Sequence, residues 1–141
     1  MSTYSLVRGV LARTVQQLTD PYNPETRDFT GIVMLDTVII LTTVPSAEFA
    51  AELGRQLVSR NLAACVNVLP PMISIYRWKG EIEQDTEWQV VIKTLHSRVD
   101  AVHATISELH PYDLPEFLVV SIVGGDPAYL AWVASCSGGE G

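Results

Sequence analysis

The sequence predicts an α+β domain in which strands and helices follow the order β-α-β-β-α-β, with an extended β-hairpin and one further helix at the C-terminal end. Two observations lead to this prediction. Short apolar segments alternate with segments that repeat apolar residues at helical spacing. A glycine-containing turn, Lys79-Gly80, separates two of the strand-like segments, as in a hairpin. The 141 residues are enough for one domain with a core of normal size.

The first strand and helix are expected between residues 37 and 60. Thr37 to Thr43 is a short apolar segment typical of a strand, and Ser46 is a residue that caps helix N-termini well. Apolar residues at helical spacing then predict one helix face packed on a sheet: Phe49, Ala50, Leu53 and Leu57. Asn61 tolerates the left-handed conformation that ends such a helix.

The next two strands should form a long hairpin. The first of them begins near Ala63, is interrupted by Pro70-Pro71 and resumes from Met72 to Trp78. Paired prolines cannot donate hydrogen bonds to a neighbouring strand, so they predict a bulge. After Lys79-Gly80 the chain returns through a strand that contains Ile82, Trp88, Val90 and Ile92.

A second helix is expected from about Ser97 to Leu109, and a fourth strand from Phe117 to Val123 that is apolar enough to be buried on both faces. The second helix should turn four residues inward: Val99, Val102, Ile106 and Leu109. Asp126-Pro127 supplies an N-cap and a first-turn proline for the terminal helix. This order of elements is that of a ferredoxin-like sandwich.

The predicted hairpin is too long for its own domain. Strands of about a dozen residues extend roughly 40 Å, whereas the radius of gyration of a domain of this size is about 13 Å. The hairpin would leave large side chains poorly covered: Ile73, Ile75, Tyr76, Trp78 and Trp88. Such strands aggregate unless another chain covers them. We therefore expect self-association through the hairpin, and the pattern alone does not distinguish a dimer from a trimer.

Charge and composition exclude several classes of partner. The net charge is −7, and residues 1–33 carry three basic and three acidic side chains, so the whole excess of negative charge falls on residues 34–141. Because the basic residues are scattered singly, we expect no nucleic-acid partner. No apolar run is long enough to span a membrane, so we expect no membrane partner. The two cysteines, Cys65 and Cys136, make no disulfide framework, which favours a reducing, cytoplasmic location.

Residues 1–33 differ from the rest. The first 19 residues carry only two charges, Arg8 and Arg13, as organelle presequences often do. We favour the alternative that this segment is a poorly ordered extension, or that Met34 is the start of a compact protein. The expected domains are thus 1–33, an N-terminal extension, and 34–141, a folded domain.

Histidine spacing argues against a metal site on one helix. His96, His103 and His110 are seven residues apart, which corresponds to about 10.5 Å along a helix. Ligand nitrogens lie about 2 Å from a zinc ion, so two of these histidines cannot share an ion within one chain. The sequence also shows no pairing of a nucleophile with a general base and no phosphate-binding loop, so we expect neither an enzyme nor an organic cofactor.

Acidic residues alternate along the third strand and should therefore lie on one face of it. They are Glu81, Glu83, Asp85 and Glu87. We expect a solvated acidic face. Neighbouring carboxylates stand about 7 Å apart along such a face, and could share a hard cation or a basic partner. A regular strand, however, lacks the curved loop that surrounds calcium.

Three separated motifs indicate a family. They are Asn61 to Asn67 (NLAACVN), Tyr76 to Glu83 (YRWKGEIE), and His110-Pro111-Tyr112 followed by Pro115-Glu116. Together they resemble the CutA proteins, described as divalent-cation tolerance proteins, over about Leu35 to Trp132. Three motifs in the same order are far more specific than one.

The resemblance implies a ferredoxin-like homotrimer in which the His110 motif borders a cleft between subunits that is associated with copper and related cations. His110 and Glu116 are therefore the expected metal ligands. Some members have a cysteine near the end of the first strand, where this chain has Thr42 and Thr43. Threonine hydroxyls are poor copper ligands, so we expect weak binding of copper or another divalent cation. The alternative is a trimeric signalling module, similar to PII proteins, that binds a small metabolite and a protein partner.

Overall fold

The computed structural model describes residues 37–138, so the predicted extension 1–33 lies outside the described residues. Residues 37–122 and 127–138 belong to one compact unit. Its sheet contains four strands, β1 (Thr37–Val44), β2 (Cys65–Trp78), β3 (Glu81–Leu95) and β4 (Leu118–Ser121). They lie in the order β2-β3-β1-β4, and all neighbours are antiparallel.

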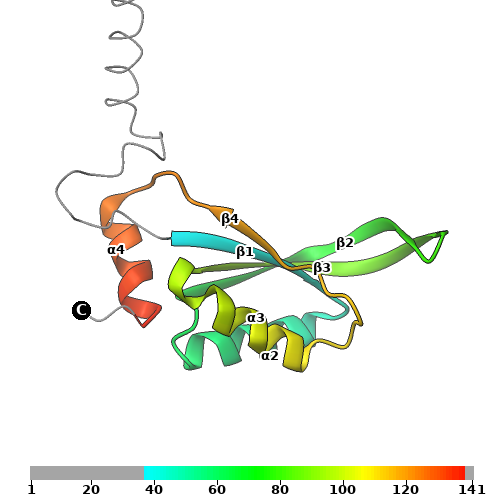
Figure 1. Cartoon of the computed structure of the whole chain (residues 1–141), viewed down its shortest axis with the longest axis horizontal. Coiled ribbons are helices and arrows are strands. Elements are labelled where there is room, and N and C mark those ends of the chain that lie inside the picture. Colours follow the sequence, from blue (N-terminus) through cyan, green and yellow to red (C-terminus); the bar gives the residue numbers. More distant parts are fainter. Residues whose placement is uncertain (1–36, 139–141) are drawn as a thin grey trace, which may run out of the picture. The chain divides into compact units, whose positions relative to one another are not determined.

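Helices α2 (Ala47–Ser59) and α3 (Val99–Leu109) lie on the same face of this sheet (Figure 1). A short 3-10 helix, η2 (His96–Arg98), precedes α3, and α4 (Pro127–Cys136) is the last element of the described chain. The order β-α-β-β-α-β followed by a helix confirms the predicted ferredoxin-like α+β fold.

Alternation along the strands builds the core. On β1 every second residue is buried beneath the helices, and the apolar stripes of α2 and α3 complete the layer. The largest fully buried apolar side chains of the described residues are Ile40, Val44, Leu53, Leu57, Val90, Ile92, Val102, Ile106 and Val133. The predicted start of α2 is confirmed, because the Ser46 hydroxyl accepts a hydrogen bond from Phe49 N at 3.1 Å. Asn61, after α2, has the predicted left-handed conformation, with φ of 55°.

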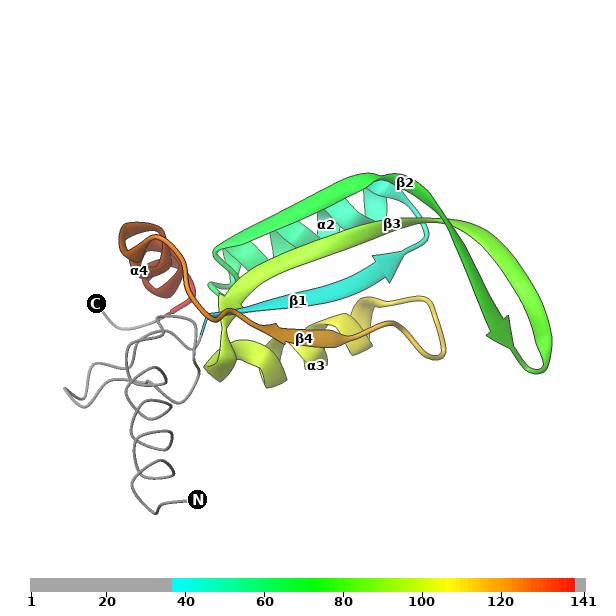
Figure 2. The ribbon, with the colours of Figure 1, turned by 90° about the horizontal axis from the view of Figure 1, so that it is seen from above.

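Strands β2 and β3 continue past the end of β1 as a two-stranded arm (Figure 2). We call residues 72–87 the hairpin arm. Lys79 and Gly80 form its turn with φ angles of 49° and 86°, and positive φ at both positions is the signature of a type I′ turn. The register of β2 against β3 shifts between Val68 and Pro71, which confirms the bulge predicted from the paired prolines.

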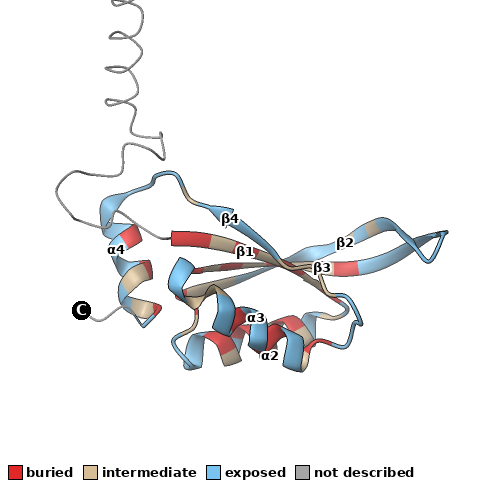
Figure 3. Cartoon of the chain, viewed as in Figure 1, coloured by how far each residue is buried: buried red, intermediate tan, exposed pale blue. Residues whose placement is uncertain are grey.

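Two expectations about burial are wrong. Strand β4 is shorter than predicted, and all four of its residues are exposed rather than buried on both faces (Figure 3). The reason is strand order: β4 pairs with β1 alone and forms an edge of the sheet. Trp88 is half-buried against the core instead of lying uncovered on the arm, because its partner in the ladder is Val44 at the end of β1.

Within residues 37–138 no helix has both the length and the apolar character that a membrane crossing requires.

Candidate functional site

A cleft of about 940 Å³ lies between the hairpin arm, the end of β1 and the loop that joins α3 to β4. We call it the acid-aromatic cleft. Its chemically distinctive lining residues are Tyr76, Trp78, Asp85, Glu87, Gln89, Tyr112, Asp113 and Glu116. None of the residues that line it is basic.

Strand register places these side chains. Met72 pairs with Glu87, and Ser74 pairs with Asp85, so alternate residues of both strands share one face of the arm. That face carries the aromatic and acidic groups of the cleft. The opposite face carries three isoleucines that are uncovered in the described chain: Ile73, Ile75 and Ile82 are 68%, 68% and 70% exposed. The hairpin arm therefore has two chemically distinct sides.

Two tyrosines donate hydrogen bonds to carboxylates in the cleft. The Tyr112 hydroxyl donates to Glu87 Oε2 at 2.9 Å, and the Tyr76 hydroxyl donates to Asp85. The bond to Asp85 is the main reason that the pKa of Tyr76 rises from 10.0 to about 12. Burial, followed by the bond to Glu87, raises the pKa of Tyr112. Both phenols consequently remain protonated donors at neutral pH.

Glu87 is the unusual member of the acidic face predicted on β3. Glu81, Glu83 and Asp85 are exposed, as expected, but Glu87 is only 6% exposed. It accepts a hydrogen bond from the Tyr112 phenol, and among residues 37–138 it takes part in no ion pair. A carboxylate removed from water is costly unless a positive charge or several donors compensate it.

His110, the predicted metal ligand, is 8% exposed at the end of α3. Tyr112 N donates a hydrogen bond to its Nδ1 at 3.1 Å, so Nδ1 carries a lone pair. Nε2 lies 2.8 Å from the carbonyl oxygen of Thr43, and therefore carries the proton that it donates. Both ring nitrogens of His110 are thus engaged in hydrogen bonds.

Glu116, the second predicted ligand, lines the acid-aromatic cleft itself. Its Oε2 accepts a hydrogen bond from Gln89 Nε2 at 2.9 Å, and the same amide donates to the carbonyl oxygen of Thr42 at 2.9 Å. The structure brings His110 and Glu116 to the same region through Tyr112 and Gln89, which both line the cleft. Over the described residues, no three His, Cys, Asp or Glu side chains are grouped closely enough to hold one metal ion.

The other two histidines do not line the acid-aromatic cleft. His96 is exposed in η2. His103 is exposed on α3, where its ring lies against Phe117 with 4.4 Å between ring centroids.

Comparison with known proteins gives the family. A family model described as "CutA1 divalent ion tolerance protein" matches residues 38–136, most of the chain. The chain belongs to the CutA1 family. Among its relatives, Protein CutA homolog from Xenopus laevis is 46% identical over 91 residues, which cover 64% of this chain and 60% of the frog protein. The divalent-cation tolerance protein CutA from Pectobacterium atrosepticum is 42% identical over 100 residues, which cover 71% of this chain and 91% of the bacterial protein.

Solved structures of CutA1 proteins agree with this fold. CutA from Xylella fastidiosa has a TM-score of 0.70 and 42% identity, with 72% of this chain and 97% of that chain covered. The CutA1 protein from Thermus thermophilus has a TM-score of 0.71 and 38% identity, and the match covers 72% of this chain and 99% of that chain. The match spans less than two thirds of several relatives, for example 60% of the frog protein and 64% of mouse Protein CutA.

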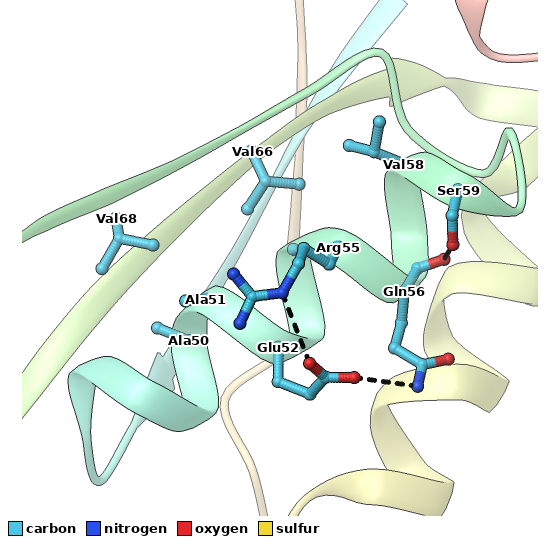
Figure 4. Close-up of a pocket in the computed structure, with 10 residues that line it drawn as sticks. Ala50, Ala51, Glu52, Arg55, Gln56, Val58, Ser59, Val66 and Val68 are labelled. Carbon is cyan, nitrogen blue, oxygen red and sulfur yellow. Dashed lines mark hydrogen bonds and ion pairs between the residues drawn. The ribbon is translucent and has the colours of Figure 1, made fainter.

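A second cavity of this CutA1 chain, of about 680 Å³, is a groove between α2 and β2. Its polar side chains bond to one another on the exposed side of α2, where Glu52 accepts hydrogen bonds from Arg55 at 3.4 Å and Gln56 at 3.2 Å (Figure 4). Gly54 allows α2 to pack closely, because a Cβ there would lie 3.2 Å from a methyl group of Val66. An exposed ion pair on an apolar groove is a weak candidate for chemistry, so the acid-aromatic cleft is the better site.

Sequence reasoning missed the partners of the acidic face in this CutA1 chain. The two-residue turn fixes the register of the arm, and in this register Tyr76 lies diagonally across from Asp85. Their hydrogen bond could therefore have been predicted from the sequence. Tyr112 and Glu87 are different, because they come from a loop and a strand separated by 25 positions. No local pattern predicts that contact or the burial of Glu87.

Proposed function

We propose that this protein serves in tolerance of divalent cations as a homotrimer that binds a copper-type cation weakly and does not turn over a substrate. The observation that carries the proposal is the position of His110 and Glu116 beside one cleft that has four acidic and no basic lining residues. The names of the family and of its bacterial relatives refer to divalent cations.

Weak binding follows from the geometry of the proposed ligands. A cation at Nε2 of His110 must replace the hydrogen bond to Thr43, and a cation at Nδ1 must replace the bond from Tyr112 N. Glu116 has one oxygen engaged by Gln89. Water or a second copy of the chain would complete the coordination. Affinity should fall in acid solution, because protons compete with the cation for an imidazole nitrogen.

The trimer is proposed from the exposed apolar side of the hairpin arm and from the resemblance to CutA proteins. Ile73, Ile75 and Ile82 form an uncovered apolar strip, and such a strip marks a surface that another chain covers. A signalling module of the PII type is less favoured, because the family match points to cation tolerance.

We propose a reducing compartment, since Cys65 and Cys136 are both free thiols. Relatives differ in location: the rice and Arabidopsis thaliana proteins are named chloroplastic, and the Archaeoglobus fulgidus protein is named periplasmic. The cytoplasm is our proposal for this chain.

Calorimetric titration of the full chain with copper tests the metal site. His110→Ala should weaken copper binding at least tenfold, about 1.4 kcal/mol, whereas His96→Ala, which removes an exposed imidazole outside the cleft, should change little. Zinc should bind less tightly than copper. Equal loss in both variants, or no loss in His110→Ala, would place the site elsewhere.

A further inference from the structure

The acid-aromatic cleft contains negative charge that nothing within the described chain neutralises. Glu87 is only 6% exposed, and among residues 37–138 its side chain accepts one hydrogen bond, from a neutral phenol. Its other carboxylate oxygen has no partner among residues 37–138. Asp85, Asp113 and Glu116 line the same cleft, and no basic residue does. A carboxylate held mostly out of water is stabilised by a positively charged partner.

The four carboxylates of the cleft do not by themselves surround one bare metal ion. An oxygen-ligated ion draws its ligands to within roughly 2.0–2.6 Å, yet the described residues include no three acidic, histidine or cysteine side chains close enough to do this. A molecule with several atoms can reach carboxylates that stand farther apart. The volume of about 940 Å³ is typical of small-molecule sites, which occupy roughly 300–1,000 Å³.

Aromatic rings supply the second part of the argument. Tyr76, Trp78 and Tyr112 line the cleft together with the carboxylates. The faces of such rings attract ammonium groups within about 6 Å. The chain itself gives an example, because the Lys79 ammonium lies 5.9 Å from the centroid of the Trp78 ring.

We propose that the acid-aromatic cleft binds a small aliphatic diamine as a ligand, with Glu87 as the principal partner of one ammonium group. A primary ammonium fits better than a quaternary one, because the Glu87 carboxylate still has a free oxygen that needs an N–H donor. The second ammonium would pair with the remaining carboxylates of the cleft. The alkyl chain would pack against the aromatic rings. This inference does not rest on copper binding, since His110 is not among the residues that line the cleft.

Calorimetric titration of the full chain with 1,4-diaminobutane tests the proposal. The wild type should bind it, and Glu87→Gln should weaken binding at least about tenfold, since a hydrogen bond to a charged group is lost. Glu108→Gln is the matched control, because it removes an exposed carboxylate of α3 that does not line the cleft. The neutral alcohol 1-butanol should not bind, and tetramethylammonium, which has no N–H donor, should bind more weakly than the diamine.

Asp85→Asn provides a second variant if Glu87→Gln does not fold, because Asp85 is exposed on the arm. It should also weaken diamine binding relative to the wild type. The proposal is overturned if the wild type takes up no diamine, or if Glu87→Gln and Asp85→Asn both bind as tightly as the wild type. Equal weakening in Glu108→Gln would likewise overturn it, because general attraction to an acidic protein would then explain the binding. A separate copper titration, without diamine, shows whether the metal proposal fails independently.

Discussion

Tyr112 donates a hydrogen bond to Glu87 across 2.9 Å, and this contact ties the loop after α3 to the base of the hairpin arm. The same loop supplies Tyr112 N to the ring of His110. One tyrosine thus contacts both the buried carboxylate of the cleft and the proposed metal ligand. A substitution at Tyr112 should therefore lower the stability of the folded protein.

Tyr112→Phe should lower the free energy of unfolding by about 1–3 kcal/mol, because Glu87 would remain buried without its donor. Thermal or urea unfolding of the full chain measures this loss. The matched control is Tyr76→Phe, which removes the same hydroxyl from an exposed pair with Asp85 and should destabilise the fold less than Tyr112→Phe, because solvent can replace the lost donor. Equal costs for the two variants would show that the burial of Glu87 does not govern the effect.

The tyrosine pairs predict how stability changes in alkaline solution. The pKa of Tyr76 is raised from 10.0 to about 12, mainly by its hydrogen bond to Asp85. Because the folded pKa lies above the unfolded one, the contribution of this bond is complete below pH 10 and is lost as the pH rises toward 12. Absorbance of phenolate should show Tyr76 titrating late, and Asp85→Asn should bring its pKa closer to 10.0. An unchanged titration in Asp85→Asn would contradict the assignment.

Assembly through the apolar side of the arm predicts that Ile75→Asp dissociates the protein. An aspartate there would place a charge in the proposed dry interface, which is strongly unfavourable. Light scattering should report a mass of about three chains for the wild type and the single-chain mass of 15.5 kDa for the variant. Val58→Asp, at an exposed valine of α2, is the control. Trp88 is a poorer test, since its contact with the core would make Trp88→Glu unfold one chain.

Removal of residues 1–33 should leave the melting temperature and the oligomeric mass nearly unchanged. The core cluster of the described residues is formed by side chains between Val38 and Ile106. Differential scanning calorimetry of the shortened and full chains makes the comparison. A fall of more than several degrees would show that the segment contributes to folding.

Local signals predicted much of the fold. The Ser46 cap, the left-handed Asn61, the Lys79-Gly80 turn and the bulge at Pro70-Pro71 each depend on a few neighbouring residues, and each is confirmed. The exposure of β4 depends instead on which strand forms the edge of the sheet. An apolar segment can form either an edge strand or a central strand, so composition could not predict the exposure of β4.

Less of the candidate site than of the fold could be predicted, because its contacts join segments that are distant in the sequence. His110 could be placed at the end of a helix, but the partner of its Nε2 is a carbonyl oxygen 67 positions away in the chain. Glu87 appeared as one of four alternating acids, and only the loop that carries Tyr112 sets it apart from the others. Contacts between distant segments determine the state of both side chains.

The bulge beside Pro70-Pro71 joins two parts of one ladder that differ in register by a single residue of β2. The two-residue turn fixes the pairs of the hairpin arm. If the extra residue were deleted, β2 would follow β3 without interruption and Tyr76 would still lie opposite Glu83. The bulge therefore does not select which side chains each face displays. Its consequence is direction, because a bulged strand bends and twists more strongly than a regular one. The path of the arm, and with it the place where its exposed isoleucines can meet another chain, depends on one inserted residue at its base.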